Sequence, residues 1–579
     1  MSRLRKRYIV LIISFVMIAG GIASAWGVQN NFGSVHTTEV ALVTAEGTYI
    51  HSTLQVHSAA SPSNPMPGVV VIHGVIQSKE WLMGFGIELA RRGFVVLTID
   101  ASAHGNSDSS PGMNADRGGI AALEYLSSQS FVSTLGMVGH SMGAGIAIDA
   151  VNESAVTVDG LVLVGGITSD LTSSWANTTY PRNVLVTVGY YDELFDVPNL
   201  LTSLAGFFGT SPPIVFGQQY GTFADGSARM IITSPSNHLF ETIDPVIISE
   251  TVDWFRNSLK GGGYDSYWIP KQNLIYQYHI LGGFIACLGL QLSLAPLMAI
   301  IINLPPFKKL KEAPSSKYAA SSKSYWGFGA LYGIIGVGTF LPFLLIGLFI
   351  NFPQSIGAPI GVWLLGSGLI AAGVLILIKQ RSGNKSLSWS DWGVFGSDAK
   401  GFLKVFGLSA LLALVLVLCL YLVMLPVDVL LALDFRAFLP LFNDLTPIRA
   451  LIMPLYLIFG IPFFVVEGTW LIGLLRTPPK KTWLRTQVVW TVKAAFIKVI
   501  PYVLVLLIQF SLTLATGTPF FAGQIGFLLL FLWMFIPMLA VAACITTWSY
   551  RLSNRVYIGA VFNALIFSWI LASILPLAI

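Results

Sequence analysis

Hydrophobic and polar positions divide the chain into two parts of different kind. Residues 35–264 alternate short apolar runs with polar stretches, whereas residues 272–579 consist mainly of apolar runs as long as a bilayer is thick. The pattern predicts a globular domain over 35–264 and a polytopic, all-helical transmembrane domain of about eight helices over 272–579. The predicted spans are 274–302, 326–350, 357–378, 403–425, 448–474, 493–515, 522–547 and 556–577.

Residues 1–26 form a further apolar segment with a basic start. Four basic residues within the first seven positions precede an apolar run from Tyr8 to Ala25. The sequence Ala23-Ser24-Ala25 would permit cleavage as a signal peptide. The run nevertheless approaches the roughly 20 residues that span a bilayer, which favours a retained signal anchor. Either version exports the domain that follows.

Within residues 35–264, apolar runs typical of buried strands alternate with stretches of helical spacing. The continuous run 68–74 indicates a strand buried on both faces of a sheet, and helical spacing over 81–92 leads to the next such run. A strand, a crossover helix and a second strand form a βαβ unit, so the alternation predicts a doubly wound, mostly parallel sheet of the α/β class. The expected strands are 68–74, 93–100, 135–139, 160–164, 184–188 and 230–233, and the expected helices are 81–92, 117–127 and 144–151.

The motif Gly139-His140-Ser141-Met142-Gly143 lies between an expected strand and the helix that follows it. At a sharp strand-to-helix turn, glycines let neighbouring elements approach closely and the serine hydroxyl is exposed above the sheet. A chain this rich in glycine can produce the motif by chance. The evidence for a nucleophile therefore comes from the position of the motif between a strand and a helix. We expect Ser141 to be a nucleophile.

A nucleophilic serine needs a base, and the base needs an acid that orients it. In this architecture the chain order is serine, acid, histidine, and Asp192 and His238 follow the strands 184–188 and 230–233. Both therefore lie at carboxyl ends of strands, where parallel sheets place their sites. The competing acid is Asp170, and the competing histidines are His73, His104 and His140.

Two backbone N–H groups are the expected donors of an oxyanion hole. One belongs to Met142, directly after the nucleophile, and the other to Val75, after His73-Gly74. Such donors would stabilise the negative charge that develops on the substrate oxygen during acyl transfer.

These motifs together resemble the α/β-hydrolase superfamily. The resemblance covers about residues 38–258, and the stretch Glu39–Leu54 is similar to the dienelactone-hydrolase and serine-peptidase branches. It implies hydrolysis through an acyl-enzyme, with Ser141 as nucleophile, His238 as base, Asp192 as its partner and no cofactor. The chain departs from the compact pattern over the 45 residues between Asp192 and His238, where we expect a cap or lid. The superfamily hosts many chemistries, so no substrate follows.

Charge predicts the orientation of the chain. The basic loops 1–7, 303–325, 379–404, 476–498 and 551–555 hold 22 Lys and Arg, whereas the alternate loops hold 3. Cytoplasmic loops carry the basic excess, so the domain 35–264 is expected to face the extracytoplasmic side of the cell membrane. That domain is acidic, with 20 Asp and Glu against 8 Lys and Arg, and no nucleic-acid partner is expected.

Polar residues inside the transmembrane part suggest further features. Glu467 lies in a predicted span near its cytoplasmic end, where its carboxylate is expected to reach the interface. Segments 387–402 and 480–498 are predicted to be interfacial helices or cytoplasmic linkers. The external loop 426–447 is predicted to lie as a helix at the surface beneath the globular domain.

The function predicted from these features is that of a membrane-bound serine hydrolase that cleaves an ester, a lipid or a related acyl substrate. Two alternatives stay open. Eight spans would also suit a transporter or receptor with a sensing head of hydrolase fold, and an acyltransferase would use the same serine. The three cysteines lie in apolar runs and the eight histidines lack paired metal-ligand spacing, so neither a disulfide nor a metal site is expected.

Overall fold

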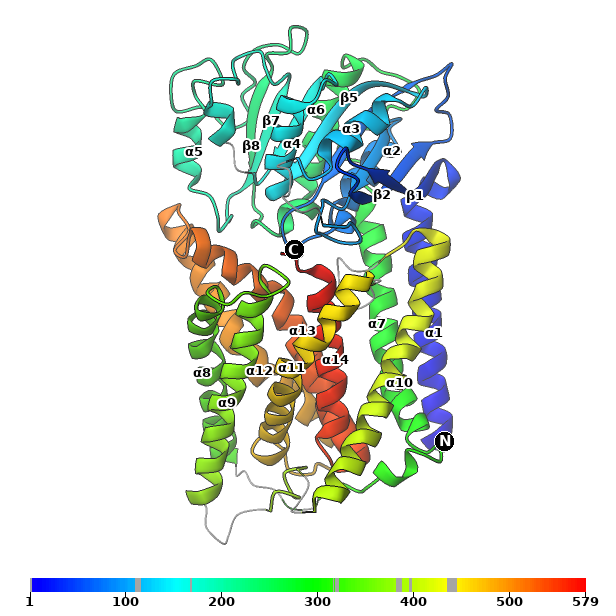
Figure 1. Ribbon diagram of the computed structural model, residues 1–579, viewed down its shortest axis with the longest axis vertical. Helices are drawn as coiled ribbons and strands as arrows, with labels where there is room; N and C mark the ends of the chain where they lie inside the picture. The colour runs from blue at the N-terminus through cyan, green and yellow to red at the C-terminus, as the bar shows by residue number, and fades with distance from the viewer. Residues whose placement is uncertain are drawn as a thin grey trace.

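The computed structural model describes residues 3–109, 116–166, 169–315, 317, 322–381, 388–394, 398–434 and 445–578. Figure 1 shows a sheet flanked by helices stacked on a bundle of long helices. The first body is called the sheet domain and the second the membrane body. The predicted division of the chain into an α/β part and a helical apolar part is confirmed.

The sheet domain is built on one eight-stranded sheet in the order β1-β2-β4-β3-β5-β6-β7-β8. Strand β2 pairs antiparallel with both β1 and β4, and every pairing from β4 to β8 is parallel. The mostly parallel sheet is confirmed, with an antiparallel pair at one edge. The strands are β1 (Val35–Val43), β2 (Tyr49–His57), β3 (Met66–Ile72), β4 (Val95–Ile99), β5 (Val132–His140), β6 (Gly160–Val164), β7 (Val184–Gly189) and β8 (Arg229–Ser234).

Helices cover both faces of this sheet because alternate strand residues point to opposite sides. Val69 and Val71 of β3 pack against one face's helices, and Val70 and Ile72 contribute to the core on the other. The central strands are therefore apolar throughout, as expected of strands buried on both faces. Helices α2 (Met83–Ala90) and α6 (Pro245–Lys260) cover the first face, and α3 (Gly119–Ser127) and α4 (Met142–Glu153) cover the second.

The segment between Asp192 and His238 contains α5 (Val197–Ser203) and lies at the β8 edge of the sheet (Figure 1). Phe207 and Phe208 are buried in the core of the second face, and the Arg229 guanidinium lies 4.4 Å from the Phe207 ring centroid. The role of this segment as a lid stays a prediction.

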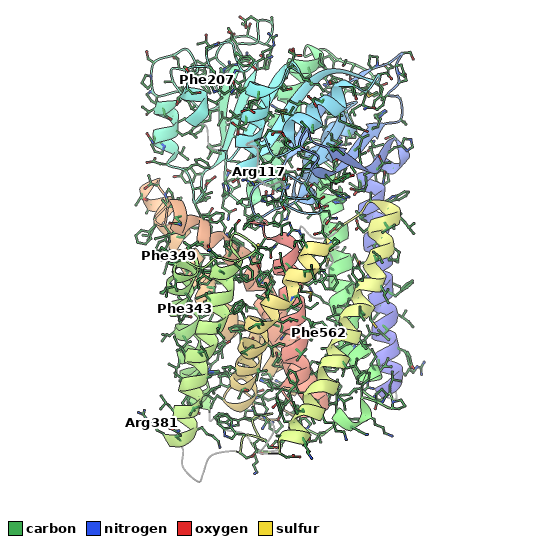
Figure 2. The ribbon with its side chains drawn as sticks, in the orientation of Figure 1. Arg117, Phe207, Phe343, Phe349, Arg381 and Phe562 are labelled. Carbon is green, nitrogen blue, oxygen red and sulfur yellow. The ribbon has the colours of Figure 1, made fainter. Side chains whose placement is uncertain are left out.

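The membrane body contains, among the described residues, nine helices long and apolar enough to cross a bilayer. The N-terminus lies at the end far from the sheet domain and the C-terminus beside it (Figure 1). Arg381, in one of the basic loops, also lies at the far end (Figure 2). The helices are α1 (Arg3–Gln29), α7 (Tyr276–Ile301), α8 (Ser322–Gly347), α9 (Gly357–Arg381), α10 (Ala399–Leu431), α11 (Pro447–Gly473), α12 (Trp483–Thr516), α13 (Gly523–Ser553) and α14 (Tyr557–Ile574).

Helix α1 packs along α7 through small residues. A Cβ added at Gly21 would lie 2.5 Å from the carbonyl oxygen of Gly282, and one added at Gly289 would lie 2.8 Å from that of Ser14. Small residues let two membrane helices approach closely enough for extensive van der Waals contact. This close contact gives the N-terminal segment a packing role in the membrane body.

The structure describes parts of three polar segments of the membrane body for which predictions were made. Residues 483–498 form the first part of the long helix α12, in which Gln487 is buried and Arg485 is exposed. The described residues 388–394 form turns in which Trp392 is buried against Gly473, and no separate helix occurs there. Helix α10 extends through Leu431; residues 435–444, which include Arg436 and Asp444, lie outside the described residues.

Glu467 also differs from its prediction. Its side chain is buried and forms an ion pair with Lys498 of α12, which the charge count assigned to a cytoplasmic loop. Charged groups in a membrane interior are costly and pair with one another, and here Lys498 pairs with Oε1 of Glu467 while both side chains are buried.

The two bodies are joined through the loop after β4. The buried guanidinium of Arg449, at the start of α11, donates to the carbonyl of Ala103 at 2.9 Å. It also donates to the carbonyls of Ala572 and Leu575, at 2.8 and 2.7 Å, while the N–H of Leu577 donates to Ala103 at 2.9 Å. One arginine thus connects the sheet domain, α11 and the C-terminal segment.

We expect Arg449→Met to lower the free energy of unfolding by about 2–3 kcal/mol, because three buried carbonyls lose a charged donor. Thermal unfolding in detergent measures the change. The matched control is Lys271→Met, whose ammonium pairs with Glu250 and Asp253 while partly exposed. This surface change should cost less than about 1 kcal/mol. Equal losses of unfolding free energy in the two variants would contradict the proposed role of Arg449 in connecting the two bodies.

Candidate active site

Ser141 lies at the turn between β5 and α4 in a strained backbone conformation. Its φ of 55° and ψ of −117° fall where L residues rarely occur. A Cβ at position 139 would lie 2.1 Å from the carbonyl oxygen of Gly143, and one at position 143 would lie 2.3 Å from that of Ile72. Both glycines are therefore required for the turn that presents the Ser141 hydroxyl.

The structure brings Ser141, His238 and Asp192 into one hydrogen-bonded chain. His238 Nε2 lies 2.9 Å from Ser141 Oγ, and His238 Nδ1 lies 2.8 Å from Asp192 Oδ2. Asp192 Oδ1 accepts from the N–H of Leu194 at 2.7 Å, which fixes the carboxylate. His238 and Asp192 are buried, while Ser141 is partly exposed. A base in contact with a hydroxyl and oriented by a carboxylate is the arrangement that activates a serine.

The loop after β3 lies beside the nucleophile. A Cβ added at Gly74 would lie 3.1 Å from the Cβ of Ser141. The loop is held by Gln77, whose Oε1 accepts from the N–H of Gly74 at 2.9 Å and lies 2.8 Å from His140 Nδ1. The loop that carries the candidate oxyanion donor Val75 therefore lies beside Ser141.

Two further carboxyl groups surround His238, and the sequence analysis missed both. Glu193 Oε2 accepts from the backbone N–H of His238 at 3.2 Å, and Glu241 Oε1 accepts from the N–H of Gly189. Glu241 Oε2 lies 3.8 Å from His238 Nδ1. Their signals were weak, since Glu193 merely follows Asp192 and Glu241 is three residues after His238.

Burial and charge set the protonation of this group of acids. Burial, reinforced by the Asp192 carboxylate, raises the pKa of Glu193 to about 7 and that of Glu241 well above its ordinary value. Burial opposes protonation of His238, but the Asp192 carboxylate and then Glu193 raise its pKa above the ordinary value. Burial thus favours the neutral form of the Glu241 carboxyl.

The competing histidines form hydrogen bonds with residues of the surrounding loops. His73 Nε2 accepts from the N–H of Ala101 at 3.1 Å, and His104 Nδ1 lies 3.0 Å from the carbonyl of Ser102. Burial lowers the pKa of His104 to about 3 and the pKa of His140 well below its ordinary value. None of them is hydrogen-bonded to Ser141. The side chain of Asp170 lies outside the described residues.

One group of side chains at the site has the composition of a metal site. Ligand atoms of His140, His238 and Glu241 all lie within 4.8 Å of one another. Both nitrogens of His238 already face Asp192 and Ser141, and His140 Nε2 lies 3.0 Å from the carbonyl of His238. These histidine nitrogens therefore already have hydrogen-bond partners, so the three side chains do not fit a metal site.

Comparison with known proteins agrees with this geometry. The family model described as serine aminopeptidase S33 matches residues 63–185, which include the turn at Ser141. The sheet domain belongs to the α/β-hydrolase superfamily. It is called the hydrolase domain from here on.

Relatives of the hydrolase domain are distant. Proteins of Mycobacterium tuberculosis and Mycobacterium bovis, both described as uncharacterized, are 25% identical over 211 residues, which is 32% of this chain and 62% of theirs. The chain thus spans less than two thirds of the length of these relatives. An sn-1-specific diacylglycerol lipase of Danio rerio is 33% identical over 129 residues, which is 22% of this chain and 39% of that protein.

Solved structures resemble the same part of the chain. An esterase of Pyrococcus furiosus is 16% identical, with a TM-score of 0.30 over 39% of this chain and 92% of that protein. A hydrolase of Thermoplasma acidophilum is 20% identical, with a TM-score of 0.29 over 38% of this chain and 99% of that protein.

Glu193→Gln is expected to move the acidic limb of the kcat/KM profile to lower pH. The Glu193 carboxylate raises the pKa of His238, so its loss lowers that pKa and leaves the base unprotonated in more acidic solution. Hydrolysis of a soluble short-chain ester across pH measures the limb. Glu124→Gln on the exposed side of α3 is the control and should leave the profile in place. A limb that moves to higher pH would contradict the assignment.

Proposed function

We propose that this protein is a membrane-bound serine hydrolase that cleaves an ester, lipid or related acyl substrate through Ser141, His238 and Asp192. The observation that carries the proposal is the chain of contacts from Ser141 Oγ to His238 Nε2 and from His238 Nδ1 to Asp192 Oδ2. A strained nucleophile turn and an acid-oriented base are the parts that acyl transfer needs.

The proposed reaction proceeds in two steps. Ser141 Oγ attacks the substrate carbonyl carbon while His238 Nε2 takes the hydroxyl proton, and the N–H groups of Met142 and Val75 stabilise the oxyanion. The carbon–oxygen bond to the alcohol breaks, and His238 returns the proton to the leaving alcohol. Water then attacks the acyl-enzyme with His238 again as base, which releases the acid and restores Ser141.

We place this reaction on the extracytoplasmic side. The support is the basic excess in the loops at the far end of the membrane body, together with a hydrolase domain that is acidic. The close packing of α1 along α7 supports a retained signal anchor, because cleavage would remove a helix that packs closely against the small residues of α7.

Labelling with a fluorophosphonate tests the nucleophile. The wild-type membrane protein should be labelled and Ser141→Ala should not, because the reagent modifies a serine that an adjacent base activates. Ser154→Ala, at the other end of α4, is the matched control and should label as the wild type does. Labelling of Ser141→Ala at wild-type level would overturn the proposal.

A further inference from the structure

The reactive edge of the hydrolase domain lies against the membrane body. Ile76, next to Val75, is buried in the apolar core of the membrane body, and Leu194, two residues after Asp192, packs against that core. A Cβ at Gly526 of α13 would lie 2.4 Å from the carbonyl oxygen of Glu193. The loops that carry the oxyanion donor and the acid therefore contact membrane helices.

Aromatic rings connect these loops across the two bodies. Tyr191 lies 5.9 Å from Phe510 of α12, and Phe510 lies 5.8 Å from Trp533 of α13. Trp533 in turn lies 4.9 Å from Phe240, two residues after His238. All distances join ring centroids. Aromatic side chains suit such a boundary because they are apolar and carry polar edges.

Beside this aromatic chain, a cavity of about 220 Å³ lies between the hydrolase domain and helices α7 and α13. Its lining is apolar apart from Glu80, which pairs with Lys79 at 2.9 Å, and His279, whose Nδ1 lies 3.1 Å from the carbonyl of Ala25. An apolar cavity of about 150 Å³ already stays dry and binds small apolar molecules. The lining includes Trp81, Leu239, Phe240, Ile280, Trp533 and Met534.

One polar group on the cavity wall has no partner. The indole N–H of Trp533 is buried, and the described residues offer it no acceptor. A buried donor without an acceptor is destabilising, and a ligand oxygen within reach of the indole N–H would supply the acceptor. The occupant suited to this wall is long and apolar and carries an acceptor.

We infer that the cavity holds part of the acyl chain of a lipid ester that reaches Ser141 from the bilayer. This inference rests on the proposed function and names its substrate class as esters of long-chain fatty acids. The cavity wall includes Leu239, which directly follows His238 in the chain, and Glu80, which lies five residues after Val75. Lining from α7 and α13 places the chain among the membrane-spanning helices.

A pair of esters with the same leaving group tests the inference. Wild-type protein in phosphatidylcholine vesicles is given the p-nitrophenyl esters of palmitic and butyric acid, so that only the acyl chain differs. Ile280→Trp fills the cavity and should lower the palmitate-to-butyrate ratio of kcat/KM by at least about ten-fold. Ile334→Trp on the exposed face of α8 is the control and should leave the ratio unchanged.

The outcomes separate the inference from the proposed function. An unchanged ratio in Ile280→Trp overturns the inference, and the proposed function stands if Ser141→Ala loses hydrolysis of both esters. If Ser141→Ala hydrolyses both at wild-type rate, the proposed function fails and the inference with it.

A second measurement needs no variant of the cavity. A palmitoyl ester with a diazirine in its chain, photolysed on Ser141→Ala in the same vesicles, should label the α13 segment around Trp533 and Met534. Labelling confined to other segments would overturn the inference.

Discussion

Replacement of His238 by alanine is expected to lower kcat for ester hydrolysis by on the order of 10⁶, the scale of losing the base of a serine nucleophile. The imidazole lies 2.9 Å from Ser141 Oγ and is its hydrogen-bond partner. Single-turnover measurements of acyl-enzyme formation in detergent show whether the loss falls on attack by Ser141. Fluorophosphonate labelling should slow in parallel, since it needs the same activated hydroxyl.

Variants of the two candidate acids test which carboxylate orients His238. Asp192→Asn should lower kcat by on the order of 10⁴, because an amide no longer holds the His238 tautomer. Asp170→Asn, the competing acid in the sequence, should leave kcat near the wild-type value. If Asp170→Asn lowers kcat strongly and Asp192→Asn does not, Asp170 is the acid that orients His238 and Asp192 is not.

Breaking the intramembrane ion pair is expected to cost about 3–5 kcal/mol of stability, because Glu467→Gln leaves the Lys498 ammonium buried without a counter-charge. Lys498→Met should cost a similar amount through the stranded carboxylate. Fluorescence-monitored thermal unfolding of the purified protein in detergent measures both.

The double variant Glu467→Gln with Lys498→Met decides whether pairing is the cause. It removes both charges and should recover most of the stability lost in either single variant, since neutral groups of similar size replace a buried pair at little cost. Glu312→Gln, which breaks an exposed pair with Arg555, is the control and should cost less than about 1 kcal/mol. Additive losses in the double variant would contradict the pairing.

The features that could be predicted from the sequence are those that depend on local patterns of residues. The motif around Ser141 could be placed because hydrophobic period and length identify the strand before it and the helix after it. The order Ser141, Asp192, His238 needed only the rule that sites lie at the carboxyl ends of parallel strands. The antiparallel edge formed by β1 and β2 was not predicted. The two strands form a hairpin, but their place in the sheet depends on the pairing of β2 with β4, which is distant in the chain.

Charges inside the membrane body were harder to interpret. Lys498 was assigned to a cytoplasmic loop because a one-dimensional count treats every lysine near a span as exposed. The structure instead buries it against Glu467, a residue 31 positions earlier on the neighbouring helix α11. Which helices are neighbours is a tertiary property that hydropathy does not carry.

By itself the sequence determined the α/β class, the apolar helices and the turn that presents Ser141, because each depends on residues close together in the chain. Only the tertiary structure decided that Glu193 and Glu241 surround His238, that Arg449 ties the two bodies together, and that an apolar cavity lies between them. These features arise where distant segments meet and exclude water. Their energies come from burial and contact, which no local pattern records.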